Sequence, residues 1–226
     1  MGPRGGFLTK QTPVYALEQV CPKPDPDCYQ RKKTAQYAFE NLDAAVDSYL
    51  QEYGPKHNGQ LRLERMGLLV PVDDAHIGVS VGRLAICTCD QDWCKAKWIV
   101  EIRCPFSIRQ LEPRSYQAAS KLPYLLCQYP ARNKLSLSLK ESSANYTQSQ
   151  MQMGVTGVHE CELFIWAKKE NDRERKSSSS PWWFEPIPVR FSASFWMQLK
   201  AKLDLFYQEY VAPYILSHED LFSDEF

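Results

Sequence analysis

A short segment near the middle of the chain places a carboxylate and a guanidinium on one side of an expected strand. Residues 98–103 read WIVEIR and are followed closely by Pro105, which predicts a mostly apolar strand. Because strand side chains alternate, Glu101 and Arg103 point to the same side. Mg²⁺ takes carboxylate ligands, whereas a guanidinium clamps phosphate oxygens but stays protonated. The pair therefore indicates binding of a metal ion or a phosphate group; a strand-edge ion pair is the alternative.

The elements that must position this pair follow from the pattern of apolar residues. Apolar residues recur at helical spacing over about 27–53, and Gly54 and Pro55 would end that helix. Short strands are expected at 67–72, 77–81, 83–87, 97–103, 124–127 and 135–139. Further helices are expected at 113–120, 145–155 and 192–216. A nearly continuous apolar run at 161–167 predicts a strand that is buried on both faces.

Several of these segments match, in order, the motifs of one family over about residues 30–216. Residues 145–157 read NYTQSQMQMGVTG, which is similar to the Y-Y-x-Q-V-Q-G-Q-M-x-V-T-G helix of YqaJ-like viral recombinases, relatives of phage lambda exonuclease. Shorter matches lie at 67–70, 77–80, 98–107 and 160–166. The resemblance implies an α/β fold with a central mixed β-sheet flanked by helices, the restriction-endonuclease-like PD-(D/E)XK core of the lambda exonuclease type.

The resemblance also implies the place of an active site. Glu101 matches the metal-binding glutamate of the family's E-x-K strand, and the backbone carbonyl of Ile102 would be a second metal ligand. Gln148 and Gln150 lie on the helix that faces the active site in the family, where a neutral amide can orient water or a phosphate oxygen. Nucleases of this class use Mg²⁺ to activate water and to stabilise the leaving oxygen. If this chain is active, Mg²⁺ is therefore the expected cofactor.

Three catalytic positions of the family carry other residues in this chain. Gly82 stands at the metal-binding aspartate of the family's S-P-D-G turn, Leu42 at a helical glutamate, and Arg103 at the lysine. Glu40, two residues before Leu42, would restore the glutamate in a shifted alignment. Four aspartates could supply a replacement carboxylate or serve as ordinary turn and cap residues: Asp73, Asp74, Asp90 and Asp92.

These departures predict a degenerate exonuclease-like protein, a catalytically impaired pseudonuclease that binds DNA or a protein partner. One alternative is an active Mg²⁺-dependent 5′ to 3′ DNA exonuclease of the recombinase type, which would hydrolyse phosphodiesters. A second alternative is an assembly protein without DNA affinity, since the ring formed by lambda exonuclease implies that this chain could form a homo-oligomer. The sequence leaves enzymatic activity open.

Length, composition and charge limit the number of domains and the kinds of partner that these hypotheses allow. The 226 residues, 44% hydrophobic and 24% charged, fit one domain: an extended arm at 1–26, the lambda-exonuclease-like domain at 27–218 and an acidic tail at 219–226. With 27 basic and 27 acidic residues, attraction to DNA requires a local basic patch. No apolar run approaches the ~20 residues of a membrane span, and there is no secretory h-region. We expect an intracellular protein without a membrane partner, in the nucleus or the cytoplasm.

Eight cysteines raise the question of disulfides or a metal site. Without a secretory signal, reduced thiols are expected. Cys87, Cys89 and Cys94 have the spacing C-x-C-x4-C, which lacks the paired C-x2-C arrangement of a firm zinc site, and Cys104 is the nearby sulfur that could complete four ligands. The sequence therefore favours a turn carrying semi-buried thiols over a zinc site at these four cysteines.

Overall fold

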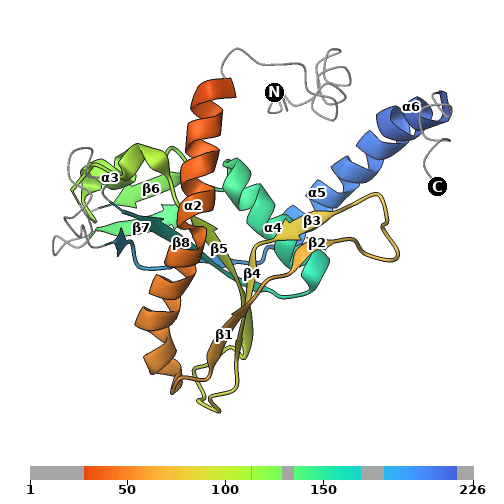
Figure 1. The fold of residues 1–226 in the computed structure, drawn as a ribbon. Helices are drawn as coiled ribbons and strands as arrows, with labels where there is room; N and C mark the ends of the chain where they lie inside the picture. Colours follow the sequence, from red (N-terminus) through yellow and green to blue (C-terminus); the bar gives the residue numbers. More distant parts are fainter. Residues whose placement is uncertain (1–27, 113, 129–134, 169–180, 218–226) are drawn as a thin grey trace.

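The computed structural model describes residues 28–112, 114–128, 135–168 and 181–217, and a mixed β-sheet lies at its centre (Figure 1). The strand order is β1 (Leu61–Glu64), β4 (Arg83–Cys87), β5 (Lys97–Arg103), β8 (Glu160–Ala167) and β10 (Ile187–Arg190), and β9 (Trp182–Trp183) also pairs with β8. β5 and β8 are parallel, whereas the other pairs are antiparallel. The expected α/β fold with a central mixed sheet is confirmed. The expected arm at 1–26 and tail at 219–226 lie outside the described residues.

Helices and two small sheets complete the fold. The α-helices are α2 (Cys28–Tyr53), α3 (Tyr116–Ser120), α4 (Ala144–Thr156), α5 (Ala193–Phe206) and α6 (Ala212–Ser217). Short 3₁₀-helices, η1 (Gly54–His57) and η2 (Phe106–Ile108), and a π-helical segment, η3 (Tyr207–Val211), are also present. β2 (Gly67–Leu69) pairs with β3 (Val79–Val81), and β6 (Leu125–Gln128) pairs with β7 (Ser136–Leu139). The sequence pattern anticipated these helices but missed β1, β9 and β10. None of the described helices has the length and apolar character needed to span a bilayer.

Alternation along the central strands builds two hydrophobic cores, one on each face of the sheet. Trp98 and Val100 of β5 belong to the core that α2 covers. Ile99 of β5 and Leu163 of β8 belong to the other core, which α4 covers. Since side chains two residues apart share a face, Glu101 lies on the same side as Ile99 and faces α4.

Residues at both ends of α4 fix its limits, and so its position over this face. The Ser143 hydroxyl accepts a hydrogen bond from the Tyr146 N–H at 3.2 Å, a side-chain cap of the first turn. At the other end Gly157 adopts a φ of 67°, a left-handed conformation that glycine takes at low cost. Its N–H donates to the Met153 carbonyl at 3.0 Å. The helix therefore presents a fixed set of side chains to Glu101.

Candidate functional site

The Glu101 carboxylate is the centre of a polar cluster between β5 and α4. Its side chain is buried, with 7% of the residue surface exposed. Oε1 accepts a hydrogen bond from Gln148 Nε2 at 3.2 Å and lies 3.0 Å from Arg103 Nη2. Oε2 accepts a hydrogen bond from Gln152 Nε2 at 2.9 Å. Both carboxylate oxygens are thus engaged by donors of this chain, and one of the donors carries a full positive charge.

Arg103 closes a three-membered network with Glu101 and Gln148. Besides its ion pair, Arg103 Nη2 donates to Gln148 Oε1 at 2.6 Å. The Arg103 side chain is 34% exposed, so part of the guanidinium is open to a ligand. Its Nε and the Gln152 Oε1 are both buried without a hydrogen-bond partner among the described residues. The cluster therefore contains one buried donor and one buried acceptor without a partner among the described residues, next to the ion pair of Glu101 and Arg103.

The titratable groups beside this pair stay neutral at physiological pH. Burial raises the pKa of Tyr124 to about 12, an effect that nearby Arg103 opposes only in part. Burial also raises the pKa of Cys161 to about 12, although a hydrogen bond from Ser149 counters it. Neither group therefore carries a negative charge beside the pair near neutral pH.

The positions of the α4 glutamines correct one expectation from the sequence. Gln148 donates to Glu101, but Gln150 does not contact this carboxylate: its Nε2 donates to the Arg190 carbonyl at 2.8 Å and its Oε1 accepts from the Ser192 N–H at 2.8 Å. Residues two apart on a helix point in nearly opposite directions, whereas residues four apart share a face. Gln152, which the sequence analysis did not single out, is therefore the second glutamine of the site. Its spacing of four from Gln148 was the available signal.

Gly82 immediately precedes β4, the strand that pairs with the Glu101 strand β5. The pairing of Arg83 with Val100 places Gly82 opposite Glu101 when the register is continued by one residue. A Cβ atom built on Gly82 would meet no other atom within 4 Å. The position thus has room for a side chain, but the residue present supplies no carboxylate.

The other expected acidic positions do not complete a metal site around Glu101. Leu42 is half-buried on α2, and Glu40 is exposed and hydrogen-bonded to Gln36 of the same helix. The Asp74 carboxylate forms an ion pair with Lys200 Nζ of α5 at 2.7 Å. Among the described residues, two groups of three or more potential His, Cys, Asp or Glu ligands come together, and Glu101 is in neither: Asp74, His76 and Asp204; and His57, Cys87, Cys89 and Cys94.

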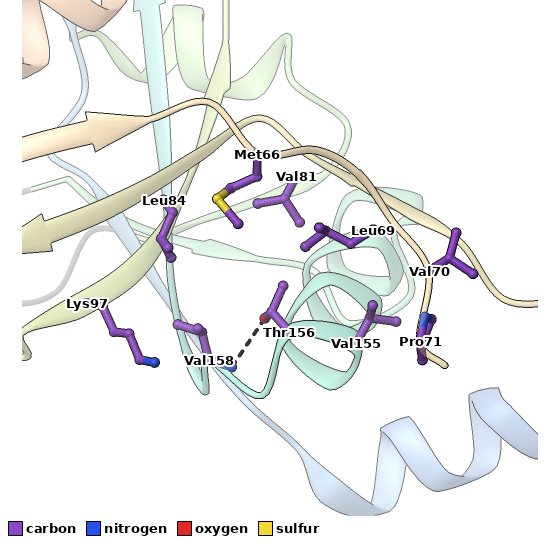
Figure 2. A pocket seen from close by; sticks show the side chains of 10 residues that line it. All are labelled: Met66, Leu69, Val70, Pro71, Val81, Leu84, Lys97, Val155, Thr156 and Val158. Atoms are coloured by element: carbon purple, nitrogen blue, oxygen red, sulfur yellow. Dashed lines mark hydrogen bonds between the residues drawn. The ribbon is translucent and has the colours of Figure 1, made fainter. Parts of the chain in front are cut away.

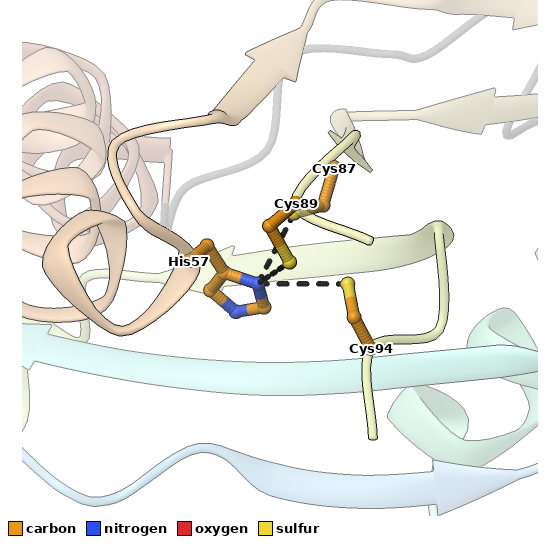
Figure 3. Close-up of side chains that lie close together, drawn as sticks. All are labelled: His57, Cys87, Cys89 and Cys94. Carbon is orange, nitrogen blue, oxygen red and sulfur yellow. Dashed lines mark hydrogen bonds between the residues drawn. The ribbon is translucent and has the colours of Figure 1, made fainter. Parts of the chain in front are cut away.

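The second of these groups changes the expectation for the cysteines. Cys87, Cys89 and Cys94 converge on one ring nitrogen of His57 (Figure 3). Cys104 is not part of the group, since its sulfur is directed at the Asn41 carbonyl at 3.9 Å. A potential metal site of three cysteines and one histidine therefore exists where the sequence analysis considered only four cysteines. His57, 30 positions before Cys87, gave no spacing signal.

A hollow near the end of α4 has a different character. It lies among β2, β3, β4 and the last turn of α4, and Lys97 is the charged residue in its lining (Figure 2). Its wall is otherwise mostly apolar: Met66, Leu69, Val70, Pro71, Val81, Leu84, Val155, Thr156 and Val158. Since this lining contains no carboxylate, the hollow offers no hard ligand for Mg²⁺.

Comparison with known proteins supports the fold. No protein-family model and no curated protein matches this chain. Among solved structures, the alkaline exonuclease LHK-Exo from Laribacter hongkongensis is similar with a TM-score of 0.55 at 16% sequence identity, over 95% of this chain and 88% of that chain. A complex of LHK-Exo with dAMP is similar with a TM-score of 0.53 at 16% identity, over 96% of this chain and 87% of that chain. The chain therefore has an exonuclease-like fold.

Proposed function

We propose that this chain is a catalytically impaired, nuclease-like protein that binds DNA phosphate at the Glu101–Arg103 site. The observation that carries the proposal is the engagement of both Glu101 oxygens by Arg103, Gln148 and Gln152. A metal nuclease uses such a carboxylate, with others, to hold Mg²⁺. Here Arg103 pairs directly with Glu101, so a metal ion that bound this carboxylate would have to displace the ion pair. The specific relation to YqaJ-like recombinases is part of the proposal and rests on residues 145–157.

The partly exposed guanidinium of Arg103 supports a phosphate as the ligand. The Arg103 side chain is partly exposed, so the accessible part of its guanidinium can donate to an incoming oxygen, whereas its Nε is buried. Guanidinium groups match phosphate geometry and form charge-assisted hydrogen bonds. The open space at Gly82, the residue before β4, is where a phosphate could approach. The structure of LHK-Exo with dAMP supports a nucleotide as the kind of ligand that this fold accepts.

The test is a DNA-binding titration combined with a nuclease assay. Fluorescence anisotropy with a 5′-phosphorylated duplex should show binding that weakens as salt rises, because phosphate contacts release counterions. Loss of charge-assisted hydrogen bonds worth roughly 1.5–3 kcal/mol predicts that Arg103→Ala binds at least about tenfold more weakly. Arg62→Ala is the matched control, since Arg62 is an exposed arginine paired with Glu64 on β1. No Mg²⁺-dependent degradation of the duplex is expected.

Two results would contradict the proposal. Degradation of duplex DNA that requires Mg²⁺ and disappears in Glu101→Ala would instead identify an active exonuclease, with Glu101 and the Ile102 carbonyl as metal ligands. Equal loss of binding in Arg103→Ala and Arg62→Ala would mean that DNA contacts the protein through general surface charge rather than through this site.

One observation favours a protein partner as a second candidate. α5 has no buried residue among those described, and it continues through η3 into α6. Several large apolar side chains of this segment are exposed: Met197, Leu205, Ile215 and Leu216. Exposed apolar surface of this kind is typical of protein contacts. Sedimentation or light scattering should then show a concentration-dependent assembly, and Met197→Glu with Leu205→Glu should abolish it without changing DNA binding by the monomer.

A further inference from the structure

Four potential soft-metal ligands meet at the closed end of the β4–β5 hairpin. Cys87 is the last residue of β4, and Cys89 and Cys94 lie in the connection to β5. His57 is the last residue of η1, directly after α2. We propose that these four side chains form a structural Zn²⁺ site, which fastens the β4–β5 connection to the end of α2.

The distances fit a tetrahedral ion. The sulfur atoms of Cys87, Cys89 and Cys94 lie 3.2, 3.7 and 3.6 Å from His57 Nδ1, and all four ligand atoms lie within 4.8 Å of one another. With Zn–S bonds of about 2.3 Å and Zn–N bonds of about 2.0–2.1 Å, a tetrahedral ion places each sulfur about 3.5 Å from the nitrogen. In Figure 3 dashed lines join Cys87, Cys89 and Cys94 to the same ring nitrogen of His57.

Hydrogen bonding alone does not account for this arrangement. A ring nitrogen of histidine carries either one hydrogen or one lone pair, so it satisfies one thiol and not three. A metal ion at the centre of the group would accept a lone pair from each thiolate and from Nδ1 at once. The convergence of three sulfurs on one nitrogen is therefore the geometry expected of ligands around a shared ion.

The backbone of the connection supports a cross-link at this place. Asp90 and Ala96, both between β4 and β5, have positive φ angles of 49° and 60°. Residues with a Cβ adopt this region at a cost in free energy, which the surrounding structure must offset. The N–H of Cys87 donates to the Ala96 carbonyl at 2.7 Å, so the strained loop is closed at its base. A metal ion bound by Cys89 and Cys94 would cross-link the two halves of this loop.

The nature and number of the ligands indicate zinc in a structural role. Thiolate and imidazole ligands select Zn²⁺ over hard ions such as Mg²⁺ and Ca²⁺. Four protein ligands fill a tetrahedral shell, whereas catalytic zinc keeps a position open for water or substrate. Cys87, Cys89 and His57 are buried. The His57 ring also stacks on Trp98 with 5.4 Å between ring centroids, which shields this side of the group.

The site is connected to the core under α2. Trp98 Nε1 donates to the Tyr49 hydroxyl at 3.1 Å, and that hydroxyl donates to Glu162 Oε2 at 2.8 Å. Trp98 precedes Glu101 by three residues on β5. Zinc would thus fix the start of the strand whose later residues carry the Glu101–Arg103 pair. The inference does not depend on the proposed function, because it rests on a different group of side chains.

The experiment measures metal content and ligand geometry in the full chain under reducing conditions. The purified protein is exposed to ZnCl₂ and free metal is then removed. Inductively coupled plasma mass spectrometry should find about one zinc ion per chain. Replacing Zn²⁺ with Co²⁺ should give the intense visible bands of tetrahedral coordination and sulfur-to-cobalt charge-transfer bands. Chelation should lower the melting temperature of the wild-type protein.

Variants separate this site from other thiols. Cys94→Ser and His57→Ala should lose the metal, and His57→Cys should retain it with a cobalt spectrum of four sulfur ligands. Cys104→Ser and Cys127→Ser are controls that should retain it, since neither cysteine belongs to the group. The proposal fails if reduced wild-type protein keeps no zinc and gives no tetrahedral cobalt spectrum. It also fails if Cys104→Ser loses the metal as completely as Cys94→Ser. The wild-type cobalt spectrum tests for tetrahedral metal binding even if a variant does not fold.

Discussion

Arg103 Nη2 lies 3.0 Å from Glu101 Oε1, although the two residues belong to the same strand and are separated by one position. The ion pair forms because alternation directs both side chains toward α4, where Gln148 bridges them. A lysine at the position of Arg103 would have a more compact, more strongly hydrated charge in place of the guanidinium, whose Nη2 contacts both Glu101 and Gln148. A substitution of either residue therefore changes the charge and the hydrogen bonds of the other.

Restoring two of the family's side chains should create a metal site. Gly82 has room for the Cβ atom of an aspartate opposite Glu101, and Arg103→Lys removes the guanidinium. We expect the double variant to bind Mg²⁺ measurably by calorimetry and to gain Mg²⁺-dependent DNA hydrolysis. Gly82→Asn with Arg103→Lys is the control, because it has nearly the same shape without the charge. If the aspartate variant binds no more Mg²⁺ than the asparagine variant, Gly82 does not occupy a metal-ligand position.

Neutralising Glu101 should affect stability and DNA binding in opposite directions. Glu101→Gln leaves Arg103 without its counter-charge, which should lower the free energy of unfolding by roughly 1–3 kcal/mol, at the lower end because Arg103 is partly exposed. It also removes a negative charge near the phosphate site, so DNA affinity should rise several-fold. Urea unfolding and anisotropy measure the two effects. A fall in DNA affinity would show that Glu101 itself contributes to binding, as a metal ligand would.

The two buried glutamines of α4 should have separable effects. Gln150→Ala removes hydrogen bonds with Arg190 and Ser192, leaves their backbone groups unsatisfied and should lower stability by roughly 1–3 kcal/mol. DNA binding by the folded protein should be unchanged. Gln152→Ala removes a donor to Glu101 and should change DNA affinity as well. If both substitutions changed DNA affinity to a similar extent, the conclusion that Gln152 contributes to the site and Gln150 does not would be wrong.

Gly154 should be intolerant of a side chain. A Cβ atom at this position would lie within 2.5 Å of two atoms of the Trp196 indole, so α4 and α5 could not keep their present approach. Alanine favours a helix over glycine by about 1 kcal/mol, but overpacking costs typically 1–3 kcal/mol. We expect Gly154→Ala to be destabilised in urea unfolding. Combining it with Trp196→Ala should recover part of the loss, and a purely additive double variant would refute steric conflict as the cause.

Alkaline pH should destabilise the folded chain in part through Cys161. Burial raises the pKa of this thiol from 9.0 to about 12, so the folded state keeps a proton that the unfolded state has lost. The resulting stabilisation is present below about pH 9 and disappears as the pH rises through about 12. Urea midpoints across this range should fall, and they should fall less in Cys161→Ala. An equal decline in both proteins would assign the effect to other groups.

Local patterns in the sequence accounted for most of the fold. The helical repeat before Gly54 predicted α2, and the apolar run at 161–167 predicted the buried strand β8, because each pattern reflects burial of one face or of both faces. β1 and β10 were missed. Both are four-residue strands, and β10 contains Pro188, so their pairing depends on the strands beside them rather than on their own composition.

The sequence by itself determined that Glu101 and Arg103 share a side of β5, since alternation is a property of any strand. It could not determine that the two side chains pair, nor that Gln152 rather than Gln150 faces them, because these outcomes depend on the rotation of α4 over the sheet. Nor did it bring His57 to Cys87, Cys89 and Cys94, since that contact forms only when α2 packs on the sheet. Short-range geometry is encoded by neighbouring residues, whereas contacts between distant segments are decided by how the packed elements meet.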